Sequence, residues 1–211
     1  MKVLFWNARV GRRPKSVVRS LRRLVKRKAP GVIVLVEARD YVPALRAEFH
    51  DRYRLRVSRD VVLLVRRDLK VGEVEHLDHL TPWRGPKAGI EHAGRGHLAA
   101  TIDGVRFVFV HMTPGGPSGG IVTRGANRPA YDADRTLIRA AFRGAEIAVC
   151  LGDQNATISE IWPFALRLGA DVVETGSKVD HAFAKGVAVF GRRLRRRYGS
   201  DHSPVLYRVH A

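Results

Sequence analysis

Polar side chains suited to acid, base or metal chemistry stand at six places where a strand is expected to end. Four of these places follow a short apolar run bounded by turn residues, which predicts a buried strand. A strand with such a group at its end presents that group at the edge of a rigid sheet. The six endings are Asn7, Glu37, His111, the Gly-Asp-Gln-Asn segment 152–155, the Val-Asp-His segment 179–181 and the Ser-Asp-His segment 200–202. We interpret them as parts of one site.

The acidic members of this set predict a bound cation. Carboxylates gathered in one cleft repel one another unless a cation neutralises them, and a hard divalent ion with oxygen ligands does so. We expect Mg²⁺, with Mn²⁺ as an alternative. The amide oxygens of Asn7 and Asn155 can coordinate the ion or orient a substrate without adding charge. The acids are Glu37, Asp153, Asp180 and Asp201.

Two histidines bring imidazole groups to the same site. His202 follows Asp201, and with Asp180 it offers an imidazole and a carboxylate to hold it. A histidine held in this way can act as a general base on water. His111 offers a second imidazole, for the phosphate or the leaving group. These parts predict metal-assisted attack of water on a phosphate ester.

The charge of the chain predicts a polyanionic partner. Its 211 residues include 38 Lys and Arg against 20 Asp and Glu, a formal net charge of +18. The excess is clustered, because residues 9–28 hold ten basic residues and no acidic one, and residues 192–197 form a second basic block. Arginine predominates, which favours bidentate contacts with phosphate oxygens. We expect nucleic acid, DNA in the first place, with contacts from Arg12, Arg13, Arg124 and Arg128.

Alternating strands and helices predict an α/β or α+β sandwich in a single domain over residues 1–211. Pro14 begins an amphipathic helix with a basic outer face that ends near Ala29. A hairpin is expected around Asp103-Gly104, and residues 78–96 and 113–128 are expected to be irregular. Further helices are expected near 41–49, 129–142 and 159–168. Further strands are expected near 32–36, 53–57, 61–66, 71–77, 147–151, 171–174, 180–184, 187–190 and 204–209.

No targeting or membrane segment is predicted. The apolar run before Asn7 is too short for a signal peptide, and no run approaches the length of a membrane span. The single cysteine, Cys150, lies within an apolar run and is expected to be a core residue. We therefore expect an intracellular, cytoplasmic protein, and we infer no obligate protein partner.

Taken in order, the motifs resemble those of the endonuclease/exonuclease/phosphatase superfamily, which includes DNase I-like nucleases and abasic-site endonucleases. Trp6-Asn7 is similar to the first motif, and Glu37 is similar to the metal-binding glutamate of the family. The segment 152–155 matches the GDxN motif, although Gln154 stands where an apolar or aromatic residue is common. His111, the segment 179–183 and the Ser-Asp-His segment 200–202 complete the series.

The resemblance implies a DNase I-like four-layer sandwich of two packed mixed sheets flanked by helices, with the motifs at one end. It implies that Glu37 is the principal metal ligand, with Asn7 and Asp201 close by. Asp180 and His202 would form an acid and imidazole pair, and His111 would stabilise charge on phosphorus. Asp153 and Asn155 would position the nucleophilic water and the scissile phosphate, with Asp153 as an alternative base or ligand of a second metal.

The leading hypothesis is a metal-dependent nuclease that hydrolyses DNA phosphodiester bonds. One alternative is a phosphatase or phosphodiesterase acting on a phosphorylated small molecule or a lipid headgroup. Another is a catalytically silent nucleic-acid-binding module. We leave His181 out of the site, because its alternation beside Asp180 points it away. We interpret Trp162 as a core residue, and His76, His79, His92 and His97 as exposed loop residues rather than zinc ligands.

Overall fold

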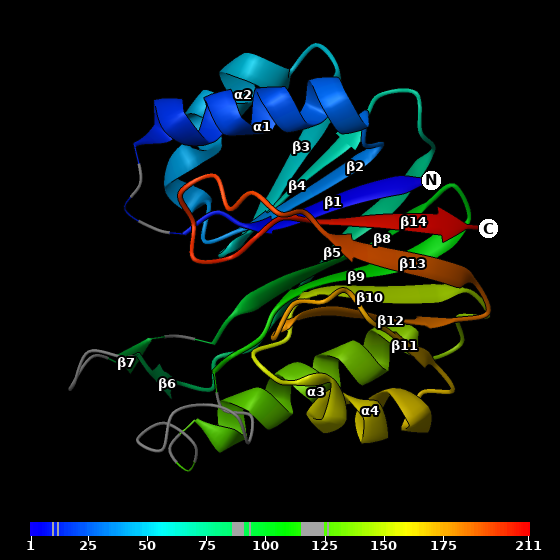
Figure 1. Ribbon diagram of the computed structural model, residues 1–211. Coiled ribbons are helices and arrows are strands. Elements are labelled where there is room, and N and C mark those ends of the chain that lie inside the picture. Colours follow the sequence, from blue (N-terminus) through cyan, green and yellow to red (C-terminus); the bar gives the residue numbers. More distant parts are fainter. Residues whose placement is uncertain (10, 12, 86–90, 93, 115–124, 126) are drawn as a thin grey trace.

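Two six-stranded sheets pack face to face between two layers of helices (Figure 1). The structure is a computed structural model that describes all residues except 10, 12, 86–90, 93, 115–124 and 126. The first sheet contains β1 (Lys2–Asn7), β2 (Val32–Val36), β3 (Tyr53–Ser58), β4 (Val61–Arg66), β13 (Ala188–Arg193) and β14 (Val205–His210). The second contains β5 (Val71–Asp78), β8 (Gly96–Ile102), β9 (Val105–His111), β10 (Ala148–Asp153), β11 (Asp171–Val173) and β12 (Asp180–Lys185). The predicted four-layer sandwich is confirmed.

The order of the strands brings the polar strand ends together. The first sheet runs β13-β14-β1-β2-β4-β3, and the second runs β11-β12-β10-β9-β8-β5. Strands β1 and β2 are parallel, as are β9 and β10, so their carboxyl ends meet at one edge. Antiparallel β12 starts at that same edge, where Asp153 pairs with Asp180 on one side and His111 on the other.

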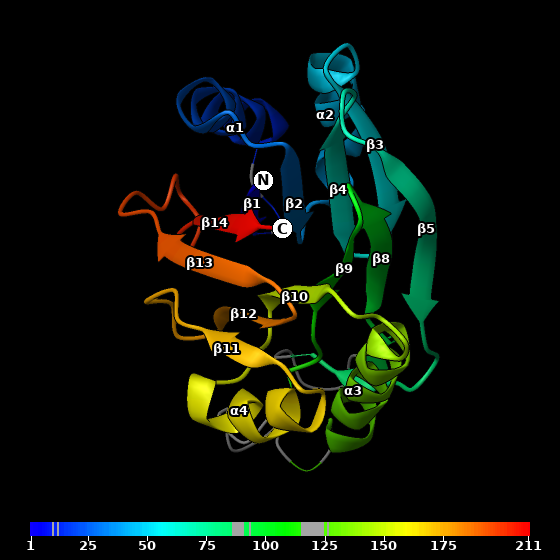
Figure 2. The ribbon, with the colours of Figure 1, turned by 90° about the vertical axis from the view of Figure 1, so that its right-hand side faces the viewer.

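Helices cover the outer face of each sheet (Figure 2). The first sheet is covered by α1 (Pro14–Lys28) and by α2 (Val42–Phe49), which follows the 3₁₀ turn η1 (Arg39–Tyr41). The second is covered by α3 (Arg128–Phe142) and α4 (Ile158–Arg167). As predicted, α1 starts at Pro14 and buries a stripe of apolar residues on the sheet while its basic residues stay outside. It ends where Ala29 adopts a left-handed conformation with φ 45°.

The core lies between the sheets and under the helices. In β1, Val3 and Phe5 belong to the core between the sheets, whereas Leu4 and Trp6 pack under α1 and α2. This alternation explains why such strands are apolar at every position, because both faces are covered. Cys150 packs under α3 and α4 and is fully buried, as expected.

Two details differ from the sequence-based expectations. Within residues 78–96, the short strands β6 (Trp83–Arg84) and β7 (Glu91–His92) form a two-stranded ladder. The interpretation of Trp162 as a core residue was wrong, because 49% of it is exposed. Helix α4 turns Ile161, Phe164 and Ala165 toward the sheet, and Trp162 lies on its other face.

Among the described residues, no helix is long and apolar enough to cross a membrane.

Candidate active site

Asn7 connects the two sheets at the edge where the strand ends meet. Its Nδ2 donates to Oε1 of Glu37 at 3.1 Å and to Oδ2 of Asp153 at 3.1 Å, while its Oδ1 accepts from the backbone N–H of Arg9 at 3.0 Å. Asn7 is 2% exposed. In this arrangement Asn7 orients two carboxylates from different sheets.

Glu37 enters the site through an uncommon backbone conformation. It follows the last residue of β2 with φ 54°, in the left-handed region that side chains other than glycine seldom occupy. This turn aims the carboxylate at Asn7, and its Oε1 lies 3.7 Å from Nε2 of His111. Such strain is often kept where it positions a functional group.

Asp153 lies at the centre of the site on β10. Its Oδ1 accepts from the backbone N–H of Asn155 at 3.0 Å, and its Oδ2 faces Asn7. The preceding Gly152 is needed for this placement, because a Cβ there would collide with the carbonyl oxygen of Val110 on β9. Asn155 has φ 46°, and its Nδ2 donates to the carbonyl oxygen of Met112 at 2.6 Å.

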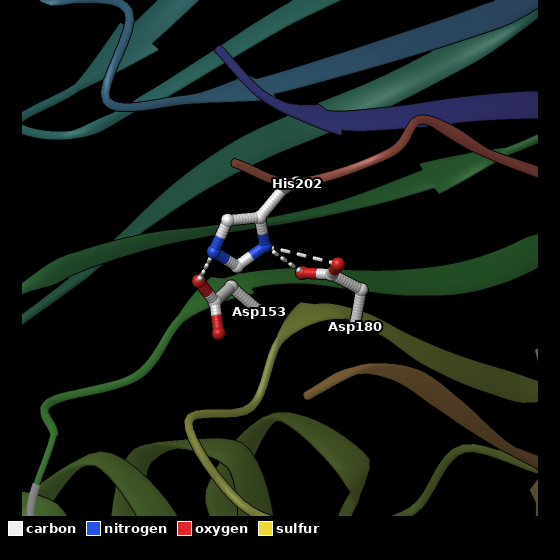
Figure 3. A group of neighbouring side chains, drawn as sticks. All are labelled: Asp153, Asp180 and His202. Atoms are coloured by element: carbon white, nitrogen blue, oxygen red, sulfur yellow. Dashed lines mark hydrogen bonds and ion pairs between the residues drawn. The ribbon is translucent and has the colours of Figure 1, made fainter. Parts of the chain in front are cut away.

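The imidazole of His202 lies between two carboxylates (Figure 3). Its Nδ1 donates to both oxygens of Asp180, at 2.9 and 3.0 Å, and its Nε2 lies 3.9 Å from Oδ2 of Asp153. Asp180 also accepts from the hydroxyl of Ser177 at 2.8 Å. The structure thus places Asp180 and His202, which the sequence pairs, in direct contact.

His111 is held by a group that the sequence-based reasoning missed. Nη1 of Arg95 lies 2.6 Å from Nδ1 of the ring and 2.7 Å from Oδ2 of Asp60. The guanidinium also lies over the indole of Trp83, 4.6 Å from the ring centroid. Burial of the ring, and then the charge of Arg95, lower the pKa of His111 well below its ordinary value.

Comparisons with known proteins agree with this architecture. No protein-family model matches the sequence, and no curated protein matches it. Solved structures do match: the 3'-5' exonuclease NExo from Neisseria meningitidis is 18% identical, with a TM-score of 0.69 and 99% of each chain covered. The mannosyl-6-phosphatase Bt3783 from Bacteroides thetaiotaomicron is 13% identical, with a TM-score of 0.70 and 100% of each chain covered. An endonuclease/exonuclease/phosphatase family protein from the same organism is 15% identical, with a TM-score of 0.70, over 99% of this chain and 94% of that chain.

The chain has the endonuclease/exonuclease/phosphatase fold. The resemblance seen in the motifs is therefore confirmed at the level of the fold, over nearly the whole chain. In this fold the chain places Asn7, Glu37, His111, Asp153, Asp180 and His202 at one end of the sandwich.

Among the described residues, the predicted Asp201, Arg13 and Arg128 make no hydrogen bond or ion pair with this group. Asp201 is exposed, and its Oδ1 is 3.3 Å from the hydroxyl of Ser200. Arg13 is exposed just before α1, and Arg128 forms an ion pair with Asp132 on α3 at 2.8 Å. Arg12 and Arg124 lie outside the described residues.

His181 points away from the group, as expected. Its Nε2 lies 2.9 Å from the carbonyl oxygen of Lys178, and the residue is 1% exposed. Its partner across the ladder is Gly152, whereas that of Asp180 is Asp153. Alternation along β12 thus separates two adjacent polar residues onto opposite faces.

In this fold, a group of acidic side chains at the end of the sandwich fits a hard divalent cation. One ligand atom each from Asp153, Asp180 and His202 lies within 4.8 Å of the others, and Glu37 adds a carboxylate next to Asn7. Burial and then the charge of Asp180 raise the pKa of Asp153 to about 6. A carboxyl group whose charge is so disfavoured marks a place where a cation would be stabilised.

The interpretation of the loop histidines was wrong for two of them. His79 and His97 both lie against Oδ1 of Asp134 on α3, at 2.7 and 2.8 Å, and His97 is fully buried. The other oxygen of Asp134 accepts from the backbone N–H of Thr113 at 2.7 Å. Burial by itself raises the pKa of Asp134, but these partners outweigh it and hold the pKa below its usual range. The cluster fixes the end of β9, because Nδ1 of His97 accepts from the N–H of His111 at 3.4 Å.

Replacing Asp134 by Asn is expected to lower the free energy of unfolding by about 2–4 kcal/mol, because the amide loses the charge and keeps only one acceptor oxygen for partners on two sides. Urea unfolding measures this change. Asp132→Asn, two residues earlier on the same helix and half exposed, is the matched control and should cost less than about 0.5 kcal/mol. Equal effects in both variants would contradict the role given to the buried cluster.

The pair of His202 and Asp180 predicts a dependence of stability on pH. Burial lowers the pKa of His202, but the hydrogen bond to Asp180, its charge and that of Asp153 outweigh it and raise the pKa to about 9. A raised pKa means that folding favours the protonated ring, so this contribution is complete below about pH 6.5. It is lost as the pH rises to about 9. In EDTA, we expect it to amount to about 1–3 kcal/mol.

Urea unfolding in EDTA at pH 6.5 and at pH 9.5 measures this contribution. His202→Gln removes the titrating ring, so the fall in stability between the two pH values should be smaller in that variant. The comparison cancels the titration of groups that do not interact with His202. An equal fall in both proteins would contradict the predicted protonation of His202.

Proposed function

We propose that this protein is a metal-dependent phosphodiesterase, a nuclease that hydrolyses DNA by attack of water on phosphorus. The observation that carries the proposal is the convergence of Asp180, His202 and Asp153 from separate strands and loops at one end of the sandwich. The net charge of +18 supports an anionic polymer as substrate. The likeness to the 3'-5' exonuclease NExo also supports a nuclease.

The ion would be held by Glu37, Asn7 and Asp201, and the carboxylates of Asp153 and Asp180 would be the further oxygen donors. When bound, it would neutralise charge on the phosphate and lower the pKa of a water molecule. Mg²⁺ suits these oxygen donors, and Mn²⁺ could replace it. In the described arrangement Nδ2 of Asn7, not its oxygen, faces the carboxylates, so we give Asn7 an orienting role as well.

Asp153 is the group that we propose to accept the proton of the attacking water. Without a bound cation, burial and then the charge of Asp180 raise its pKa to about 6, which makes it basic for a carboxylate. One bond forms between the water oxygen and phosphorus, and one ester bond between phosphorus and oxygen breaks. His202, whose pKa is about 9, is then a cation that stabilises the phosphoryl charge and has a proton for the leaving oxygen.

Asn155 and His111 flank Asp153 and complete the proposed site. The N–H of Asn155 fixes one oxygen of Asp153, and the Nε2 atom of His111 lies 3.8 Å from the other. We propose that both residues contact the scissile phosphate. Around the site, Arg12, Arg13, Arg124 and Arg128 remain the proposed contacts to the nucleic-acid backbone.

A second candidate function is a phosphatase or phosphodiesterase acting on a phosphorylated small molecule or lipid headgroup. The likeness to Bt3783 favours it, because that protein has the same fold and is named a mannosyl-6-phosphatase. The third candidate is a silent nucleic-acid-binding module. We rank it last, since the chain retains every residue type that the proposed chemistry needs.

The test is incubation of the purified protein with supercoiled plasmid in Mg²⁺ or in EDTA, beside His202→Ala. We expect nicking or degradation that needs both the metal and His202. His210→Ala, which changes an exposed histidine on β14, is the matched control and should cut like the wild type. Cleavage that persists in His202→Ala would reject the assigned site. Hydrolysis of a sugar phosphate without any cutting of DNA or RNA would select the second candidate.

DNA binding should also weaken steeply with salt. Each phosphate neutralised by an arginine releases counterions, so the logarithm of the binding constant should fall linearly with the logarithm of the salt concentration. Fluorescence anisotropy with a labelled oligonucleotide in EDTA measures the slope. A flat response would argue against a nucleic-acid partner.

A further inference from the structure

The two imidazoles of the proposed site are held in opposite ways. His202 directs Nδ1 at the carboxylate of Asp180, which can only accept, so that nitrogen carries a hydrogen. His111 directs Nδ1 at Nη1 of Arg95, at 2.6 Å. A guanidinium can only donate, so this nitrogen of His111 must accept and carries none.

The remaining nitrogen of His111 therefore holds the hydrogen. Nε2 faces the centre of the site, 3.7 Å from Oε1 of Glu37 and 3.8 Å from Oδ2 of Asp153. A neutral imidazole has one donor and one acceptor nitrogen, and the bond that one nitrogen makes decides the role of the other. In His111 the acceptor nitrogen is Nδ1, which accepts from Arg95, so Nε2 is the donor.

Arg95 is itself fixed on two sides. Nη1 carries two hydrogens. It donates one to Nδ1 of His111 and the other to Oδ2 of Asp60, at 2.7 Å. Cζ of Arg95 lies over the indole of Trp83, 4.6 Å from the ring centroid, and the side chain of Arg95 is 10% exposed. Stacking of this kind keeps the planar group in one orientation.

Asp60 would be the direct partner of His111 if Arg95 were absent. Its Oδ2 lies 3.7 Å from Nδ1 of the ring, just beyond a hydrogen bond. A carboxylate in contact with Nδ1 would place the hydrogen there and leave Nε2 as an acceptor. Arg95, inserted between the two, reverses this outcome.

We propose that Arg95 is a positioning residue that makes Nε2 of His111 a fixed hydrogen-bond donor toward an anionic oxygen of the substrate. It acts through His111, with Asp60 and Trp83 holding it in place. The consequence is a division of roles, in which His202 exchanges protons and His111 does not. Nε2 of His111 is also unable to serve as a metal ligand or as a base in this state. The assignment of the substrate oxygen as a phosphoryl oxygen rests on the proposed function.

The first test measures the tautomer of His111 directly. Long-range ¹H–¹⁵N correlation spectra of the full-length labelled protein in EDTA distinguish the two neutral forms, and His111→Gln assigns the signals. We expect the hydrogen on Nε2 in the wild type and in Arg95→Lys, since lysine also only donates. In Arg95→Ala, we expect it on Nδ1, facing Asp60. A hydrogen on Nδ1 in the wild type would overturn the proposal, even if Arg95→Ala does not fold.

The second test uses plasmid cleavage in Mg²⁺. Arg95→Ala should lower kcat about 100-fold with little change in KM, and Arg95→Lys should recover a large part of it. Arg106→Ala is the matched control. Arg106 lies on β9 like His111, but at the opposite end of the strand, where it pairs with Glu75, so the variant should change neither kcat nor KM. Unchanged kcat in a folded Arg95→Ala variant would overturn the proposal. A wild type with the expected tautomer but no phosphoesterase activity would instead reject the proposed function.

Discussion

Asp153→Asn is expected to abolish cleavage and, in the absence of metal, to make the protein more stable. The activity should fall at least about 1000-fold, because the variant loses the proposed proton acceptor and one carboxylate of the cation site. The stability should rise because folding raises the pKa of Asp153 to about 6, so its ionised form is disfavoured at pH 7.5. The amide keeps only one acceptor oxygen, which limits the gain to about 1 kcal/mol.

Both effects are measured on the same preparation. Plasmid cleavage in Mg²⁺ gives the activity, and urea unfolding in EDTA at pH 7.5 gives the stability. Asp171→Asn on β11 of the same sheet is the matched control, since that residue is exposed and should change neither quantity. A variant that is less stable than the wild type in EDTA would contradict the electrostatic repulsion inferred for the site.

Asp180→Asn is expected to lower kcat about 1000- to 10,000-fold while leaving the fold and DNA binding intact. The carboxylate both orients the ring of His202 and stabilises its charge, through contacts at 2.9 and 3.0 Å. An amide in its place would favour a different hydrogen-bonding form of the ring. The pKa of His202 should fall from about 9 toward its ordinary value, which NMR titration in EDTA measures.

Asp180 and His202 should also behave as one unit. The double variant Asp180→Asn/His202→Ala should lose hardly more activity than His202→Ala alone. Ser177→Ala, which removes the hydrogen bond to the Asp180 carboxylate at 2.8 Å and the one from the backbone N–H of Asp180 at 3.2 Å, provides a graded comparison and should cost only about tenfold. Additive losses in the double variant would show that the two residues act separately.

Much of the architecture could be predicted from the sequence because its signals are local. The apolar stripe and first-turn proline of α1, the apolar run of β2 and the Asp-Gly turn between β8 and β9 each specify an element without knowledge of its partners. The polar strand ends could be grouped because parallel β1–β2 and β9–β10 place them at one edge.

The residues that hold the site together could not be found in this way. Asp60 and Arg95 lie on separate loops with no motif around them, and they meet only because β4 and β8 belong to facing sheets. The burial of His79 and His97 could not be predicted, because their partner Asp134 lies far along the chain, on a helix that covers the sheet from outside. Such contacts depend on tertiary packing, which periodicity does not encode.

The position of β14 has a consequence for synthesis on the ribosome. The strand pairs with β1, so the first sheet is completed only when chain made early meets chain made late. His202, just ahead of β14, is translated after every other residue of the proposed catalytic group. A nascent chain therefore contains the acidic residues of the site before it contains His202. Products of stalled translation should be inert, and with β1 left as an open edge they should be prone to aggregation and degradation.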